Sequence, residues 1–321
     1  MQDTFLRNIR YLRISVTDRC NLRCKYCLPE DVEFFDNSEI LTYDEIYKIS
    51  YVMSNMGVDT IRMTGGEPLL RADCVDLISD IKKLPNIQKV RITTNGIYLT
   101  KYIDRLSKIG IDGLNISLDT LDAKLFHEMT GADRFNKVWD GIMAALERNI
   151  KVKINVVLIK GMNEHEIIPL TRLAEKYPID VRFIELMPID VCSSLKLEGV
   201  QYDYIMDIIS SVYHDISLDS TEKGLGPAKY FKSSTMKGSI GFIDPMSHGF
   251  CDNCNRLRLT SEGFLKLCLY HNDGTNLRDL LRSGISDDSL QLAILEALRQ
   301  KPLQHFFNDC AGFKTMSKIG G

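Results

Sequence analysis

The sequence lacks the features that identify membrane, secreted and nucleic-acid-binding proteins. Its first residues, Met1 to Arg10, contain Phe5, Leu6 and Ile9 but no continuous apolar run, so we expect neither a signal peptide nor a membrane anchor. Basic residues are not in excess either: the formal net charge is −3 and the pI is about 6.1. Because a protein that binds nucleic acid in bulk is expected to be basic, we expect no such partner. Any anionic ligand must be held by a local cluster of Lys and Arg.

The cysteine content argues against a disulfide framework. Nine cysteines is an odd number, and the chain shows no secretory address. Reduced thiols that serve metals, with the remainder buried as small apolar residues, fit better. The length of 321 residues and the apolar share of 44% suit a soluble globular protein with one large barrel-type domain or two ordinary ones. We therefore expect a cytoplasmic, metal-using protein without a membrane partner.

The first part of the chain alternates between short apolar runs and amphipathic patterns. Thr42 and Glu45 form the signature of a capping box at the first predicted helix. Six runs rich in Ile, Val, Leu or Thr predict strands, at Leu12–Thr17, Thr60–Thr64, Val90–Thr94, Gly113–Leu118, Val152–Ile159 and Val181–Leu186. Six strand–helix repeats predict a parallel sheet with crossover helices, either a barrel two strands short of eight or an open doubly wound sheet.

After Met187 the pattern changes to short strands and isolated helices. The predicted helices are Asp203–Val212 and two stretches around Asn276–Ser283 and Ser289–Gln300. The predicted strands are Tyr230–Ser233, Ile240–Ile243, Arg256–Thr260 and Phe264–Cys268. We therefore expect residues 1–190 to form the strand–helix unit and residues 191–321 to form a C-terminal region packed on it.

A run of three cysteines directly follows the first predicted strand. Cys20, Cys24 and Cys27 lie in the loop at the carboxyl end of that strand, where ligand sites of strand–helix folds converge. Three thiolates can bind three irons of a 4Fe–4S cluster and leave the fourth iron open to a small molecule. A zinc knuckle is the alternative, but zinc normally closes its site with a fourth ligand, and no further Cys or His lies nearby in the sequence.

This C-x3-C-x2-C pattern after a first strand resembles the signature of the radical S-adenosylmethionine (SAM) superfamily. There, the open iron chelates the methionine part of the cofactor, and one electron cleaves the cofactor to a 5′-deoxyadenosyl radical. The turn Thr64-Gly65-Gly66-Glu67-Pro68 resembles the superfamily's GGE motif, which binds the cofactor's amino group. The resemblance further implies cofactor contacts from Tyr26, Gly66, Ser117 and Met187.

A second set of cysteines lies near the carboxyl end of the sequence. Cys251 and Cys254 form a C-x2-C, and Cys268 follows after thirteen residues. The spacing suits an iron–sulfur cluster or a zinc site completed by His271 about equally. Leu257 and Leu259 alternate with Arg256 and Arg258, so one face of the predicted strand packs and the other presents two guanidiniums. Arginines fixed beside a metal centre indicate an anionic ligand held next to it.

The segment C-x2-C-N-R-x-R-L-T-x-x-G-x-L-x-x-C is similar to the C-terminal motif of the GTP 3′,8-cyclase family of molybdenum cofactor biosynthesis. Arg13-Ile14-Ser15-Val16-Thr17-Asp18-Arg19-Cys20 and the terminal Gly320-Gly321 resemble the same family, and the resemblance runs from about residue 5 to 321. It implies an α/β fold, an incomplete (β/α)6 TIM-type barrel with a C-terminal extension of short strands and helices. It also implies a lyase with two 4Fe–4S clusters and SAM as cofactors.

The resemblance also implies roles for individual residues. Cys20, Cys24 and Cys27 would hold the cluster that binds SAM. Cys251, Cys254 and Cys268 would hold a second cluster whose open iron contacts the guanine of GTP, with His271 as a bystander. The implied GTP-binding residues are Arg13, Arg62, Thr93, Lys153, Arg256 and Arg258. Arg13 and Lys153 lie within predicted strands, where a charged side chain is costly without an anionic partner. Cys74, Cys192 and Cys310 match no motif.

The implied partners are the GTP substrate, an electron donor and a downstream cyclic pyranopterin monophosphate synthase. A barrel with an open side also leads us to expect that the C-terminal region or a second subunit, as in a homodimer, covers it. Two alternatives stay open. Another radical SAM enzyme with an auxiliary cluster would lack the Arg256–Arg258 pair and the Gly-Gly end. A non-catalytic zinc-binding module would contain zinc and no iron.

Overall fold

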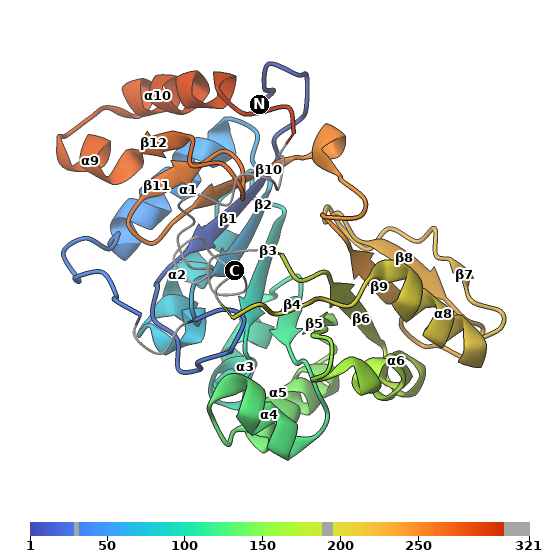
Figure 1. The fold of residues 1–321 in the computed structure, drawn as a ribbon. Helices are drawn as coiled ribbons and strands as arrows, with labels where there is room; N and C mark the ends of the chain where they lie inside the picture. Colours follow the sequence, from blue (N-terminus) through green and yellow to red (C-terminus); the bar gives the residue numbers. More distant parts are fainter. Residues whose placement is uncertain (29–31, 188–194, 305–321) are drawn as a thin grey trace.

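The structure is a computed structural model that describes residues 1–28, 32–187 and 195–304. Its centre is a parallel sheet of six consecutive strands connected by helices (Figure 1). The strands are β1 (Tyr11–Ser15), β2 (Thr60–Thr64), β3 (Lys89–Thr94), β4 (Leu114–Ser117), β5 (Val152–Val157) and β6 (Ile179–Ile184). The helices are α1 (Tyr43–Asn55), α2 (Cys74–Lys82), α3 (Leu99–Ile109), α4 (Ala123–Thr130), α5 (Phe135–Glu147) and α6 (Ile167–Lys176). The predicted strand–helix alternation is confirmed, and each strand end lies within two residues of its predicted position.

The C-terminal region adds strands to both edges of this sheet. The strand order is β12-β11-β10-β1-β2-β3-β4-β5-β6-β9-β8-β7, and both β10 against β1 and β9 against β6 are parallel. The added strands are β7 (Ser217–Leu218), β8 (Lys229–Lys232), β9 (Ile240–Ile243), β10 (Arg256–Leu259), β11 (Phe264–Lys266) and β12 (Gly274–Asn276). The strands of the C-terminal region therefore continue the sheet at both of its edges. The boundary predicted at residue 190 lies outside the described residues.

The helices of the C-terminal region lie at opposite ends of the sheet (Figure 1). Helix α8 (Tyr202–Val212) lies beside β7 to β9, whereas α9 (Leu277–Arg282) and α10 (Asp287–Arg299) lie beside β10 to β12. No helix in the described ranges is long and apolar enough to cross a membrane.

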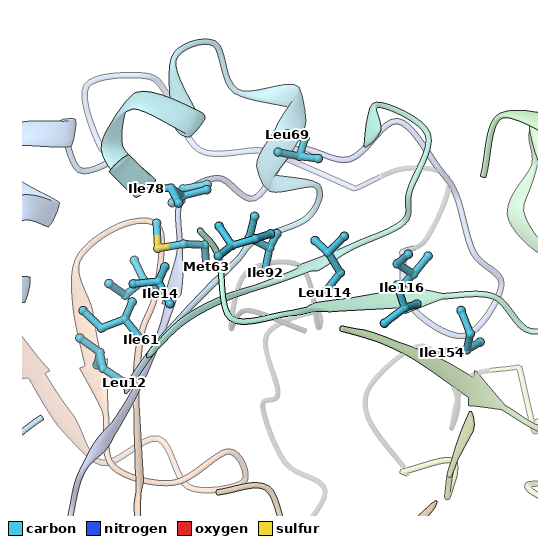
Figure 2. Close-up of a cluster of buried hydrophobic side chains, with 14 of the residues drawn as sticks. Leu12, Ile14, Ile61, Met63, Leu69, Ile78, Ile92, Leu114, Ile116 and Ile154 are labelled. Atoms are coloured by element: carbon cyan, nitrogen blue, oxygen red, sulfur yellow. The ribbon is translucent and has the colours of Figure 1, made fainter. Parts of the chain in front are cut away.

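The core forms between the outer face of the sheet and its helices. Leu12 and Ile14 on β1 and Ile61 and Met63 on β2 are fully buried, and Figure 2 shows them packed in one cluster with Ile78 of α2. Burying each such side chain stabilises the fold by roughly 1.5–3 kcal/mol. The residues between them in sequence point to the other face, as the period of two in a strand requires. The inner face is therefore free to carry polar groups.

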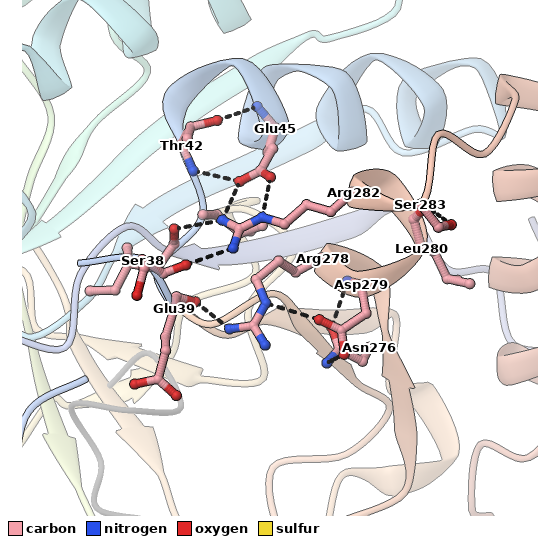
Figure 3. Close-up of polar contacts among 12 residues, drawn as sticks. Ser38, Glu39, Thr42, Glu45, Asn276, Arg278, Asp279, Leu280, Arg282 and Ser283 are labelled. Atoms are coloured by element: carbon pink, nitrogen blue, oxygen red, sulfur yellow. Dashed lines mark hydrogen bonds and ion pairs between the residues drawn. The ribbon is translucent and has the colours of Figure 1, made fainter. Parts of the chain in front are cut away.

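Helix α9 fixes the C-terminal region to the start of α1. The predicted capping box is confirmed: the Glu45 backbone N–H donates to Thr42 Oγ1 over 3.2 Å, and the Thr42 N–H donates to Glu45 Oε2 over 2.7 Å. The same carboxylate accepts from Arg282 Nε over 2.7 Å (Figure 3). Arg282 and Arg278 also donate to the Ser38 and Glu39 carbonyls. These contacts join α9 to the segment that leads into α1.

Candidate active site

The inner face of the sheet carries a row of cationic side chains. In the strand register Arg258 on β10 lies opposite Arg13 on β1, Arg13 lies opposite Arg62 on β2, and Arg62 lies opposite Arg91 on β3. Strands of a parallel sheet are normally continuous apolar runs in the sequence, because helices or other apolar groups cover both faces of the sheet. Here only the outer face is apolar. The sequence therefore builds a polar, positively charged interior.

A cavity of about 330 Å³ opens on this interior. All six cysteines predicted as metal ligands line it: Cys20, Cys24, Cys27, Cys251, Cys254 and Cys268. Cys20 follows the carboxyl end of β1, whereas Cys254 directly precedes the amino end of the parallel strand β10. The two cysteine sets therefore lie at opposite ends of the parallel strands, and the arginine row crosses the sheet between these ends.

The loop of the first cysteine set is held against the turn after β2. The Gly66 N–H donates to the Thr17 carbonyl over 2.7 Å, and the Glu67 N–H donates to the Arg19 carbonyl over 2.9 Å. A Cβ atom at Gly66 would lie 2.3 Å from the Arg19 carbonyl oxygen, so only glycine allows this approach. Gly66 thus serves the loop that carries Cys20, and it also lines the cavity.

Glu67 joins the ends of β2 and β3 rather than lining the cavity. Its fully buried carboxylate accepts from Thr94 Oγ1 and the Asn95 N–H, each over 2.7 Å, and from the Leu69 N–H over 3.0 Å. Burial raises the pKa of Glu67 to about 7 despite these bonds. Asn95 in turn lies with its Nδ2 3.8 Å from Cys20 Sγ. The carboxylate therefore supports the first cysteine site from outside.

The four predicted SAM contacts, Tyr26, Gly66, Ser117 and Met187, all line the cavity. The Tyr26 hydroxyl donates to Asp119 Oδ2 over 2.7 Å, and the other carboxylate oxygen accepts from the Val157 N–H over 2.8 Å. Burial raises the pKa of Asp119 to about 6. Asp119 also lines the cavity, so it is a polar group that the sequence analysis missed.

The first cysteine set fits a group that brings positive charge. Burial raises the pKa of the Cys24 thiol well above its ordinary value, and charge on Cys27 raises it further. Burial also raises the pKa of Cys20 to about 11. Thiols in such surroundings become thiolates only when a cation is bound, as iron would be. An iron–sulfur cluster, with one thiolate for each iron, suits this donor set.

The second cysteine set has cations built into its surroundings. Burial opposes ionisation of Cys254, but the neighbouring Lys301 and Arg256 lower the pKa of its thiol overall. Cys251 begins the 3-10 helix η3 (Cys251–Asn253), and its carbonyl accepts from Arg7 Nη1 over 2.9 Å. Within the described residues, no three His, Cys, Asp or Glu side chains are grouped to hold one metal ion. His271, considered as a fourth zinc ligand, does not line the cavity.

Five of the six predicted GTP-binding residues line the cavity: Arg13, Arg62, Thr93, Arg256 and Arg258. Arg62 Nη1 donates to Thr93 Oγ1 over 3.3 Å, and its Nε donates to the Tyr11 hydroxyl. Burial and the nearby Arg258 lower the pKa of Arg13 well below its ordinary value. Like charges at such close spacing are costly, which favours binding of a polyanion.

Lys153 is the exception among the predicted residues. Its Nζ lies 3.2 Å from Asp180 Oδ2 and donates to the Tyr230 hydroxyl over 2.8 Å, outside the cavity wall. Burial lowers the pKa of Lys153 to about 7, and Asp180 opposes this shift. Arg182 lines the cavity, although the sequence analysis did not name it. Its Nη2 donates to Asn155 Oδ1, while its Nε is buried with no hydrogen-bond partner among the described residues.

The sequence pattern that identified Arg13, a charged residue between apolar neighbours in a strand, is also present around Arg182. In β6 the apolar Val181 and Phe183 flank it, so a charged residue between two buried apolar neighbours was the available signal. Cys74 is buried on α2, as expected for a cysteine outside any motif. Cys192, Cys310 and the Gly320-Gly321 end lie outside the described residues.

Comparison with known proteins agrees with this geometry. Residues 14–174 match the family model of the radical SAM superfamily, and residues 179–307 match the model "Molybdenum Cofactor Synthesis C". The GTP 3′,8-cyclase of Clostridium perfringens strain SM101 is 46% identical over 308 residues, which cover 96% of this chain and 95% of that protein. The chain belongs to the GTP 3′,8-cyclase family.

Other members extend this relationship. The GTP 3′,8-cyclase of Desulforamulus reducens is 42% identical over 325 residues, with full coverage of both chains. Molybdenum cofactor biosynthesis protein 1 of Bos taurus is 41% identical over 307 residues, covering 95% of this chain and 48% of the bovine protein. As a GTP 3′,8-cyclase family member the chain is a radical SAM enzyme, and this superfamily is defined by a 4Fe–4S cluster and SAM.

A solved structure supports the fold. The crystal structure of Streptococcus suis SuiB bound to S-adenosylmethionine has a TM-score of 0.64 and 19% sequence identity, and the match covers 92% of this chain and 68% of that chain. At this identity the likeness concerns the fold alone. It confirms the partial barrel that the family resemblance implied and that the strand count had left open.

Proposed function

We propose that this chain converts GTP to (8S)-3′,8-cyclo-7,8-dihydroguanosine 5′-triphosphate, the first step of molybdenum cofactor biosynthesis. The observation that carries this proposal is the single cavity lined by all six motif cysteines and by Arg13, Arg62 and Arg258. Family membership at 46% identity supports the same reaction. The cavity has the chemistry to hold a nucleoside triphosphate between two metal sites.

Cys20, Cys24 and Cys27 would hold the cluster that binds SAM, with Tyr26, Gly66, Ser117 and Met187 around the cofactor. When bound there, cluster and cofactor supply the 5′-deoxyadenosyl radical that removes the 3′ hydrogen of the ribose. The chain's own residues position the reactants and exclude water. Tyr26 is held by Asp119, which fixes the orientation of its ring at the cavity wall.

The arginine row would bind the triphosphate. Guanidiniums bind phosphate oxygens through paired, charge-assisted hydrogen bonds. Arg13, Arg62, Arg256 and Arg258 serve this role in our proposal, with Thr93 as a hydroxyl donor, and Arg182 joins them because its buried Nε lacks a partner within the described residues. Lys153 would have to leave Asp180 to reach the substrate, so we assign it a secondary role.

Cys251, Cys254 and Cys268 would hold a second 4Fe–4S cluster, whose open iron would contact the guanine. The region after residue 190 would thus supply the base-recognition end of the site. An electron donor must reduce the first cluster, and a separate synthase would consume the product. A cytoplasmic location fits reduced thiols of this kind.

The decisive experiment is turnover by the anaerobically reconstituted and reduced full-length chain. With SAM and GTP we expect 5′-deoxyadenosine and a cyclised triphosphate isomeric with GTP, detected by mass spectrometry. Cys24→Ser should abolish both products, whereas Cys74→Ser, at a thiol outside the cavity, should form them normally. If 5′-deoxyadenosine forms no faster with GTP than with ATP, the substrate assignment is wrong.

Iron analysis tests the second cluster separately. We expect about eight iron ions per chain, as two 4Fe–4S clusters require, and about four in Cys251→Ser. Four irons in the unchanged protein that Cys251→Ser does not reduce would contradict the two-cluster proposal. Bound zinc in place of iron would instead support the non-catalytic zinc-binding module.

A further inference from the structure

A buried lysine lies against the segments that carry the second cysteine set. Lys301 follows α10 and is only 3% exposed, although lysine is rarely buried to this degree. Its Nζ donates to the Arg256 carbonyl over 3.1 Å and to the Leu267 carbonyl. These acceptors belong to the two segments that carry Cys254 and Cys268.

A second buried cation holds the remaining cysteine segment. Arg7 is 7% exposed and pairs with Asp3, with 2.6 Å between Nε and Oδ2. Its Nη1 donates to the Cys251 carbonyl over 2.9 Å and to the Leu303 carbonyl over 2.8 Å, and Nη2 donates to the Pro302 carbonyl over 2.7 Å. Arg7 therefore ties the segment that follows Lys301 to the Cys251 turn.

We propose that Lys301 is a positioning residue for the second cysteine site, where its ammonium fixes the loops of Cys254 and Cys268 and sets the reduction potential of the bound cluster. The inference rests on the proposed second cluster. A nearby positive charge favours the reduced cluster, because reduction adds negative charge. The family resemblance assigned cysteines and arginines to this site but no lysine.

The geometry favours an electrostatic role over simple packing. An apolar side chain could fill the same space, but it would leave the Arg256 and Leu267 carbonyls without their buried donor. The two carbonyl oxygens accept from the ammonium and hold it between the segments of Cys254 and Cys268.

The test measures the second cluster without interference from the first. Full-length chain with Cys20, Cys24 and Cys27 changed to Ser is reconstituted anaerobically, and its iron content and midpoint potential are measured by electron paramagnetic resonance titration. Lys301→Met in this background removes the charge at similar length. We expect the reduction equilibrium to shift at least tenfold toward the oxidised cluster, which is about 59 mV for a one-electron couple.

Two further variants separate charge from structure. Lys301→Arg keeps the charge, so its midpoint potential should stay close to that of the parent. Lys301→Gln removes the charge and should shift the potential as Lys301→Met does. If Lys301→Met does not fold, Lys301→Gln takes its place in the test. Lys108→Met, at an exposed lysine of α3, is the matched control and should change neither iron content nor potential.

The outcomes distinguish this inference from the proposal on which it rests. An iron-free parent would overturn the second cluster, and the role of Lys301 with it. An iron-loaded parent whose potential and iron content stay the same in Lys301→Met, or shift equally in Lys301→Arg and Lys301→Gln, would overturn the role of Lys301 alone.

Discussion

Replacing Arg258 should stabilise the substrate-free protein and weaken GTP binding at once. The side chain is 9% exposed and lies opposite Arg13 in the strand register. Burial and the neighbouring Arg256 lower the pKa of Arg258 to about 10 from its ordinary value of 12.5. One pKa unit corresponds to about 1.4 kcal/mol, so holding this guanidinium charged costs the folded protein about 3 kcal/mol.

The sign follows from the direction of the shift. A base whose pKa is lowered on folding destabilises the folded state at every pH below the folded pKa, so the cost is fully present at pH 7. Arg258→Met removes it, while lost hydrogen bonds subtract about 1 kcal/mol each. We expect a net gain of about 1–2 kcal/mol, seen as a melting temperature roughly 2–4 °C higher without GTP.

Binding should change in the opposite direction. A lost charge-assisted hydrogen bond to phosphate weakens binding by about 1.5–3 kcal/mol, or about 10- to 100-fold in Kd. At a GTP concentration 100 times the unchanged protein's Kd, GTP stabilises that protein by about 2.7 kcal/mol, and the variant should gain about half of this or less.

The assays are anaerobic equilibrium binding of GTP and thermal melting with and without it. Arg105→Met, at an exposed arginine paired with Asp76, is the matched control and should shift stability by less than about 1 kcal/mol. A variant that melts lower without GTP yet binds it as tightly would refute the reasoning, since Arg258 would then be a structural residue. Loss of iron would lead to the same conclusion.

Three further predictions concern the framework of the site. In Gly66→Ala the new Cβ would lie 2.3 Å from the Arg19 carbonyl oxygen, so the iron content assigned to the first cluster should fall. The control Gly249→Ala places its Cβ in open space and should bind iron normally. Equal iron contents in the two variants would contradict the role of Gly66. The pKa of Glu67 is about 7 when folded and near 4.5 when unfolded, so the free energy of unfolding should decrease as pH rises from about 4.5 to 7. Glu67→Gln should remove that part of the slope in melting curves measured across pH, and an unchanged slope would exclude Glu67 as its source. Arg282→Ala breaks the hydrogen bonds from α9 to α1. Because the Arg282 side chain is 39% exposed, we expect the free energy of unfolding in a denaturant titration to fall by only about 1 kcal/mol. A decrease above about 3 kcal/mol would contradict this expectation and show that these contacts hold the edge of the sheet.

The sequence by itself predicted most of the strands and helices and the candidate ligands of the two proposed metal sites. Strand β2 and strand β9 were predicted residue for residue, because each is a short apolar run between clear breaks. The capping box at Thr42 is equally local. The spacing of Cys20, Cys24 and Cys27 indicated an iron–sulfur cluster, because neighbouring ligands on one loop are fixed by local chain geometry. The spacing of Cys251, Cys254 and Cys268 suited a cluster or a zinc site about equally, and only the family resemblance favoured the cluster.

Only the tertiary structure decided how the parts meet. No local pattern says that β10 lies parallel to β1 or that β9 lies parallel to β6, since pairing between distant segments depends on the whole packed sheet. That pairing places Arg258 beside Arg13 and brings all six cysteines to one cavity. It also directs Lys153 to Asp180 and leaves Arg182 on the cavity wall, a difference that alternation alone could not resolve. The two cysteine runs supplied the candidate metal ligands, and the pairing of strands far apart in sequence brought them to one cavity.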